Sequence, residues 1–173
     1  EKKVRDSAVK ITDGYGHGSG GIVQYYDLQL VFTAQHVANG RIGQQYYVLN
    51  GSTMEVAILI YADPLHDIAV LYLGKGSKLQ GRGMKYSPRE TLAGAGPQLM
   101  LNTYGWFGCS GSVIYDTSGD IVGILWGVDI EQRPDLQVQE NMVWVSPIQN
   151  LDIKLATKEL CIALEDDPKA CRK

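Results

Sequence analysis

Short apolar segments alternate with clusters of glycine and other turn residues along most of the chain, a pattern typical of an all-β protein. In the first half, alternating or continuous apolar residues predict strands over 9–11, 20–26, 28–33, 45–49, 54–61 and 68–73. Asn50 and Gly51 separate two of these segments and are typical of a hairpin turn. The Gly- and Lys-rich segment 74–83 then predicts a link to a second unit.

In the second half, the pattern predicts strands over 85–86, 98–103, 112–115, 121–126 and 142–145, with a turn over 116–119. Pro147 is favourable in a first helical turn and predicts a helix over 148–164. This predicted helix has apolar residues at Leu151, Leu155, Leu160 and Leu164. We therefore expect a first β-unit in residues 1–78, a second in 79–146, and a C-terminal helix and tail in 147–173.

Composition agrees with a folded protein and excludes several classes of function. With 173 residues, 45% of them hydrophobic, the chain can bury a sizeable core. The net charge of −3 and the lack of a basic cluster interleaved with aromatic residues give no reason to expect nucleic-acid binding. No apolar run is long enough to span a membrane. Three histidines without a suitable cluster predict no metal, and no cofactor is implied.

The cysteines bear on the compartment of the protein. Three cysteines, a small and odd number, are typical of a reducing environment, so we expect an intracellular protein without a disulfide framework. Cys161 and Cys171 could pair near the C-terminus, and the sequence leaves this open. The chain begins at Glu1 without a signal peptide or an initiator methionine, which predicts a mature or excised fragment.

The segment 108–114, Gly-Cys-Ser-Gly-Ser-Val-Ile, is the strongest candidate for chemistry. Its glycines allow a sharp bend that can expose the hydroxyl of Ser110 and direct the N–H groups of the turn into one small space. Such a space is what an oxyanion hole requires. Because glycine and serine are also ordinary turn residues, this segment by itself is a weak signal.

Two upstream segments strengthen the case for catalysis. An apolar strand ends in 33–36 (Thr-Ala-Gln-His), so His36 lies just past the strand, where a neutral imidazole can take a proton from a serine. Asp67 stands before the apolar segment 68–73, where a carboxylate can orient the imidazole. A structural histidine and a turn carboxylate are the ordinary alternatives. The order His, Asp, Ser is one of the few in which this set of residues occurs.

Five segments together resemble the chymotrypsin-fold serine peptidases, the group that contains trypsin, the bacterial high-temperature-requirement proteases and many viral polyprotein proteases. They are 18–23 (Gly-Ser-Gly-Gly-Ile-Val), 32–37 (Phe-Thr-Ala-Gln-His-Val), 67–71 (Asp-Ile-Ala-Val-Leu), 108–112 (Gly-Cys-Ser-Gly-Ser) and 120–127 (Asp-Ile-Val-Gly-Ile-Leu-Trp-Gly). They follow the order of the family and span most of the chain. The resemblance implies two six-stranded antiparallel β-barrels and a C-terminal α-helix.

The resemblance also implies a function. The protein would be a serine endopeptidase acting on a protein or peptide substrate through an acyl-enzyme, as a viral or phage polyprotein protease or a bacterial trypsin-like protease. Ser110 would be the nucleophile, His36 the general base and then acid, and Asp67 the residue that orients His36. The backbone N–H groups of Gly108 and Ser110 would form the oxyanion hole. The oligomeric state is left open.

Substrate-binding residues follow from the same resemblance. They are Tyr104, Leu125, Trp126 and Gly127, and Tyr104 would lie near the base of the primary pocket. Tyr104 is neither a carboxylate nor a tiny residue, which favours an apolar or medium-sized residue before the scissile bond. Asp129 is an alternative that would favour lysine or arginine.

Other residues and a second function remain as alternatives. Cys109 stands where zymogen-activated relatives carry an acidic residue, so we expect no trypsin-type activation. Cys109 is also a rival nucleophile, although the position that matches the family's nucleophile is Ser110. We expect His17 and His66 to lie outside the triad. The alternative function is a catalytically silent binding module on the same fold, and the intact set of His, Asp and Ser argues against it.

Overall fold

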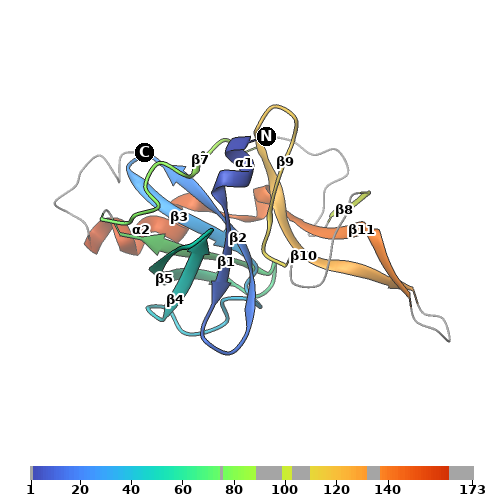
Figure 1. Cartoon of the computed structure of the whole chain (residues 1–173), viewed down its shortest axis with the longest axis horizontal. Helices are drawn as coiled ribbons and strands as arrows, with labels where there is room; N and C mark the ends of the chain where they lie inside the picture. The colour runs from blue at the N-terminus through green and yellow to red at the C-terminus, as the bar shows by residue number, and fades with distance from the viewer. Residues whose placement is uncertain (1, 75, 89–98, 103–109, 132–136, 164–173) are drawn as a thin grey trace.

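The computed structural model describes residues 2–74, 76–88, 99–102, 110–131 and 137–163. In this part of the chain, strands form two sheets, and helices α1 (Lys2–Ser7) and α2 (Ile153–Ala163) lie near its two ends. Figure 1 shows the strands of the N-terminal half on the left, in blue to green, and the long orange strands of the other sheet on the right.

The first sheet closes into a barrel. Its strands are β1 (Ala8–Thr12), β2 (His17–Tyr25), β3 (Leu28–Thr33), β4 (Gln45–Asn50), β5 (Thr53–Asp63) and β6 (Ile68–Leu73). They pair antiparallel in the order β1-β4-β5-β6-β3-β2, and β2 pairs back with β1, which closes the barrel. The short β7 (Met84–Lys85) pairs parallel with β2. The six strands predicted for this half are confirmed, and 28–33 and 68–73 have the predicted bounds.

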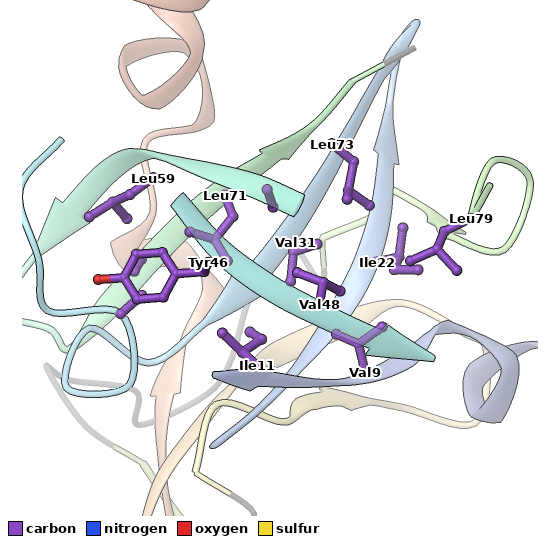
Figure 2. Packing of buried hydrophobic residues seen from close by; sticks show 13 residues of the cluster. Val9, Ile11, Ile22, Val31, Tyr46, Val48, Leu59, Leu71, Leu73 and Leu79 are labelled. Carbon is purple, nitrogen blue, oxygen red and sulfur yellow. The ribbon is translucent and has the colours of Figure 1, made fainter. Parts of the chain in front are cut away.

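Strand β3 is buried along its whole length because its two faces belong to two different cores. Val31 lies in the barrel interior with Leu71 of β6, whereas Leu30 and Phe32 belong to a second cluster with Val70 of β6. Figure 2 shows the interior cluster, to which all six barrel strands contribute. Since successive side chains point to opposite faces of a strand, a continuous apolar run is what a strand covered on both faces requires.

The second sheet has four strands among the described residues. They are β8 (Leu99–Asn102), β9 (Val113–Tyr115), β10 (Ile121–Glu131) and β11 (Gln137–Pro147), in the order β8-β11-β10-β9. One closed barrel and one four-stranded sheet are therefore described, and the second barrel expected from the sequence remains a prediction, as do the domain boundaries at 78/79 and 146/147. Strands β10 and β11 run well beyond the predicted 121–126 and 142–145, because Gly127 and Asp129 in β10 and the polar residues of 137–141 in β11 interrupt the apolar pattern.

The second sheet packs against the outer face of the barrel. Ile121 and Ile124 of β10 share a buried cluster with Phe32 of β3, so this sheet covers the outward side of β3. Close approach is also required between β9 and β2, because a Cβ on Gly21 would lie only 2.8 Å from Cγ2 of Val113. The seam between the two sheets is thus tightly packed and places the segment that precedes β9 against the barrel.

The helices differ from the prediction in three respects. Helix α1 was not predicted, because its polar sequence has no apolar periodicity. The predicted helix 148–164 begins only at Ile153, after a 3₁₀ turn η1 (Ile148–Asn150), since Asp152 Oδ1 accepts the N–H of Leu155 at 3.1 Å as an N-cap. Leu151 and Leu160 pack on the buried cluster that contains Phe32, but Leu155 is 55% exposed, and Leu164 lies outside the described residues. No helix in the described part of the chain is long and apolar enough to cross a membrane.

Candidate active site

His36 lies in a single helical turn directly after β3. The N–H groups of Val37 and Ala38 both donate to the carbonyl of Ala34, at 3.0 and 3.3 Å, which forms the turn. Ala34 and Ala38 are fully buried, so the turn is anchored in the core at both ends. The imidazole of His36 projects from this anchored turn and is 48% exposed.

Asp67 lies at the end of the loop that joins β5 to β6, immediately before β6. Its backbone is in the left-handed region, with φ at 58°, which is uncommon for a residue other than glycine, although aspartate tolerates it better than most. The loop is tight, because Asp63 at the end of β5 pairs directly with Ile68 at the start of β6. The barrel places this loop beside the turn of His36 because β6 is the antiparallel neighbour of β3.

The structure brings His36 and Asp67 together through two contacts. The backbone N–H of His36 donates to Oδ1 of Asp67 at 2.8 Å, and the imidazole Nδ1 lies 2.6 Å from Oδ2. With Nδ1–H as the donor, Nε2 is the basic nitrogen of the neutral ring. The hydrogen bond to Asp67 raises the pKa of His36; burial opposes this, and attraction to the carboxylate charge adds to it.

A second pair of the same kind was not foreseen from the sequence. His66, expected to lie outside the triad, has its Nδ1 2.7 Å from Oδ2 of Asp63 and does not bond to Asp67. The turn residue Pro64 between them is a sequence signal for this loop, because Asp-Pro favours turn initiation. His17, the other histidine outside the candidate triad, is the exposed first residue of β2.

Ser110 lies at the seam between the sheets. Its carbonyl accepts the N–H of Ser19 in β2 at 2.9 Å, and the next residue, Gly111, donates its N–H to the carbonyl of Leu125 at 2.6 Å. The Ser110 hydroxyl lies 3.4 Å from the carbonyl oxygen of Trp126. One bond to the barrel and one to β10 therefore hold the backbone around Ser110.

Gly111 brings the serine turn against the strand that leads to His36. A Cβ on Gly111 would lie 2.4 Å from Oγ1 of Thr33, the last residue of β3 and three residues before His36. In the described part of the chain, no hydrogen bond joins Ser110 to His36. Catalytic hydrogen bonds are often long in a protein without substrate and tighten in the complex, so the separation is compatible with a catalytic pair.

The predicted substrate-binding residues are only partly described. Leu125 is buried, and Trp126 is half-buried and stacks on Trp144 with ring centroids 6.0 Å apart. The pairing of β10 with β11 shifts register between Leu125 and Gly127, which leaves Trp126 without a partner in that ladder. Bulges of this kind are frequent beside active sites. The remaining predicted residues that lie outside the described part are Tyr104, Gly108 and Cys109.

Among the described residues, no group of three or more His, Cys, Asp or Glu side chains is arranged to hold a metal ion. Asp129, the alternative specificity residue, is a β10 residue that pairs with Gln139 of β11.

Comparisons with solved structures identify the fold. No protein-family model and no curated protein sequence matches the chain. The NSP4 proteinase from equine arteritis virus is similar at a TM-score of 0.58 and 16% identity, over 82% of this chain and 72% of that one. A human pathogenic astrovirus serine protease has a TM-score of 0.62 and 13% identity, over 83% of this chain and 90% of that one. The serine endoprotease from Yersinia pestis has a TM-score of 0.64 and 20% identity, over 95% of this chain and 65% of that one. The chain thus has the chymotrypsin-like serine peptidase fold expected from its motifs.

Proposed function

We propose that this chain is a serine endopeptidase with Ser110 as nucleophile, His36 as general base and Asp67 as the residue that orients His36. The observation that carries the proposal is the double contact between His36 and Asp67, at 2.8 and 2.6 Å, on this fold. A carboxylate that binds both the backbone and the Nδ1 of one histidine fixes the ring and its tautomer together. That arrangement is needed for proton transfer at Nε2.

The reaction follows from this geometry in two stages. As Ser110 Oγ attacks the substrate carbonyl carbon, Nε2 of His36 takes the hydroxyl proton, and the Asp67 carboxylate stabilises the imidazolium. The imidazolium then gives the proton to the departing amine, which breaks the peptide bond and leaves an acyl group on Ser110. Water then attacks this ester while Nε2 of His36 takes its proton, and the imidazolium returns the proton to Ser110 Oγ as the bond between Oγ and the acyl carbon breaks and the carboxylic acid product leaves.

Stabilisation of the oxyanion is assigned to the backbone N–H groups of Ser110 and Gly108. The bond from Ser19 N–H to the Ser110 carbonyl supports this assignment only in part: it anchors to the barrel the residue that carries one of the two N–H groups. Preorganised donors of this kind are usually the largest single contribution to acyl transfer.

A protein or peptide is the proposed substrate. Tyr104, Leu125, Trp126 and Gly127 are the proposed binding residues, and the register shift at Trp126 supports a role for its backbone in pairing with a substrate strand. An apolar or medium-sized residue before the scissile bond is preferred. Two sources remain in the proposal, a viral or phage polyprotein protease and a bacterial trypsin-like protease.

A fluorophosphonate probe tests the proposal directly. An activated serine attacks the phosphorus and becomes labelled, whereas an ordinary serine hydroxyl does not. We expect stoichiometric labelling of the folded protein, loss of labelling in Ser110→Ala, and a modified peptide that contains Ser110 in mass spectrometry. Labelling that survives in Ser110→Ala would refute the nucleophile assignment.

The second candidate is a catalytically silent binding module. One observation favours it: the Ser110 hydroxyl is within reach of the carbonyl of Trp126, at 3.4 Å, and is not bonded to His36. A hydroxyl held in this way would not be activated. Absence of labelling in the folded protein would support the binding module.

A further inference from the structure

The loop between β5 and β6 is held by the carboxylate of Asp63, the last residue of β5. Oδ1 accepts the N–H groups of Leu65 and His66 at 3.1 and 3.3 Å, and Oδ2 lies 2.7 Å from Nδ1 of His66. All three contacts stay within residues 63–66. The side chains of Asp63 and His66 are 18% and 25% exposed, which is well sheltered for an ionisable pair in a loop.

These three contacts form a clamp on residues 63–66, and Asp67 follows it directly. The left-handed backbone of Asp67 needs support from its surroundings. Its φ of 58° lies in a region that costs a non-glycine residue about 1–3 kcal/mol and that persists only where surrounding contacts impose it. That conformation is also the one in which both carboxylate oxygens of Asp67 meet His36. The clamp fixes the loop on one side of Asp67, and the pairing of Ile68 with Asp63 fixes it on the other.

We propose that Asp63 is a positioning residue for the candidate triad, and that its hydrogen bonds to the loop and to His66 hold Asp67 in the conformation that orients His36. Its effect on turnover rests on the proposed function, whereas its effect on the His36 ring does not. Asp63 acts through Asp67 and touches no reacting atom. His66 completes the clamp, because its ring binds Oδ2 while Oδ1 binds the two backbone N–H groups of the loop.

Three variants separate the parts of the clamp. Asp63→Ala removes all three contacts. Asp63→Asn keeps one oxygen to accept the two backbone N–H groups. The oxygen that accepts from His66 Nδ1–H is replaced by an NH₂ group, which is a donor. His66→Ala removes the ring contact alone. The matched control is Asp13→Ala, because Asp13 Oδ1 accepts two backbone N–H groups, of Tyr15 and Gly16, in another turn of the same barrel.

Two measurements are made on each folded variant. The first is kcat and KM on a peptide substrate, where Asp63→Ala is expected to lower kcat by about 10- to 100-fold with little change in KM, since small misplacements of catalytic groups have effects of this size. The second is the NMR titration of the His36 ring. Asp67 supplies both contributions that raise the pKa of His36, so a misplaced Asp67 should lower that pKa. Asp63→Asn and His66→Ala should show smaller changes in the same directions, and Asp13→Ala none.

The NMR titration keeps this inference separate from the proposed function. If the wild-type protein hydrolyses no peptide, the proposed function fails, but a lowered His36 pKa in Asp63→Ala still supports the positioning role. A folded Asp63→Ala protein with the same kcat and the same His36 titration as Asp13→Ala overturns it. If Asp63→Ala does not fold, unchanged titration in both Asp63→Asn and His66→Ala overturns it equally.

Discussion

Asp67 holds His36 by its main chain and its ring at once, with one carboxylate oxygen on the backbone N–H at 2.8 Å and the other 2.6 Å from Nδ1. The ring cannot rotate about its side-chain bonds without losing the second contact, and the turn that carries it cannot move without losing the first. The pair therefore fixes which nitrogen of His36 is basic as well as where it lies.

Asp67→Asn is expected to lower kcat by about 10⁴-fold, as the same change does in a known triad. The amide oxygen can still accept the backbone N–H of His36, so the fold should be retained. The amide nitrogen, a donor, favours a ring with its proton on Nε2, which is then unable to accept a proton from the serine. Steady-state kinetics on purified protein measure the effect.

Thermal unfolding of Asp67→Asn is the control, since a misfolded protein would also be inactive. A well-folded variant with near-normal turnover at neutral pH would remove Asp67 from the triad. Asp63, the nearest other candidate in the sequence, would not be a simple substitute, because its carboxylate is engaged by His66.

The pH dependence of kcat/KM should show an acid limb above the ordinary histidine pKa of 6.5. The hydrogen bond from Asp67 raises the pKa of His36, and catalysis needs the neutral ring, so activity falls as pH drops through that raised value. In Asp67→Asn, any residual activity should have its acid limb at lower pH. An acid limb of the wild type at or below 6.5 would contradict the raised pKa of His36, and the absence of any acid limb would contradict the assignment of His36 as base.

The same shift has a consequence for stability. Because the folded pKa of His36 is raised, its protonation favours the folded state, and this contribution is complete below the unfolded value and lost as pH rises through the folded value. The difference in Tm between wild type and Asp67→Asn should therefore be largest on the acid side of this window and shrink toward alkaline pH. A difference that grows with pH would contradict the interaction.

Ser110→Ala should abolish proteolysis, with a loss on the order of 10⁶-fold in turnover, and leave the fold intact. Removing a hydroxyl that makes one long contact, at 3.4 Å, should cost little stability. Turnover is measured on freshly purified protein with a peptide substrate, and circular dichroism checks the fold.

Two neighbouring substitutions serve as matched controls for that variant. Ser112→Ala removes a hydroxyl two positions along the same segment, and Cys109→Ala removes the rival nucleophile. Both should retain most activity. A loss in Cys109→Ala as large as that in Ser110→Ala would indicate a cysteine mechanism.

The barrel was predictable because its strands carry simple signals. β3 and β6 were predicted at their observed bounds, since each lies between two cores and is apolar at nearly every position. His36 and Asp67 could be predicted as candidate site residues because one lies just after β3 and the other just before β6. Burial on both faces made the strand ends, and with them the candidate site, visible in the sequence.

The features that the sequence did not predict depend on contacts that leave no local sequence pattern. The bond between Ser19 and the Ser110 carbonyl joins strand β2 to the turn that precedes β9, two segments far apart in the sequence. The clamp of Asp63 on His66 is a contact between two side chains of one loop, and the sequence predicted only that His66 lies outside the triad. The helix predicted from Pro147 begins later, because Asp152 caps it and Pro147 ends β11 instead.

Gly111→Ala should be more damaging than an equivalent change elsewhere. Gly111 has φ at +99° and would place a Cβ only 2.0 Å from the backbone carbonyl oxygen of Ser19, the atom to which Thr33 Oγ1 also donates. Gly43 has nearly the same φ, +98°, with nothing within 4 Å of its Cβ position, so Gly43→Ala carries the conformational cost alone.

We expect Gly43→Ala to cost about 1 kcal/mol of unfolding free energy and to leave turnover unchanged, because strain is confined to its own exposed turn. Gly111→Ala should add about 1–3 kcal/mol for the overlap with backbone that has no room to move. It should also lower kcat, because relief of that overlap requires the segment carrying Ser110 to separate from the strand that leads to His36. Denaturant unfolding and kinetics on both variants give the comparison. Equal effects of the two substitutions on stability and on kcat would show that the serine turn does not depend on close contact with the barrel.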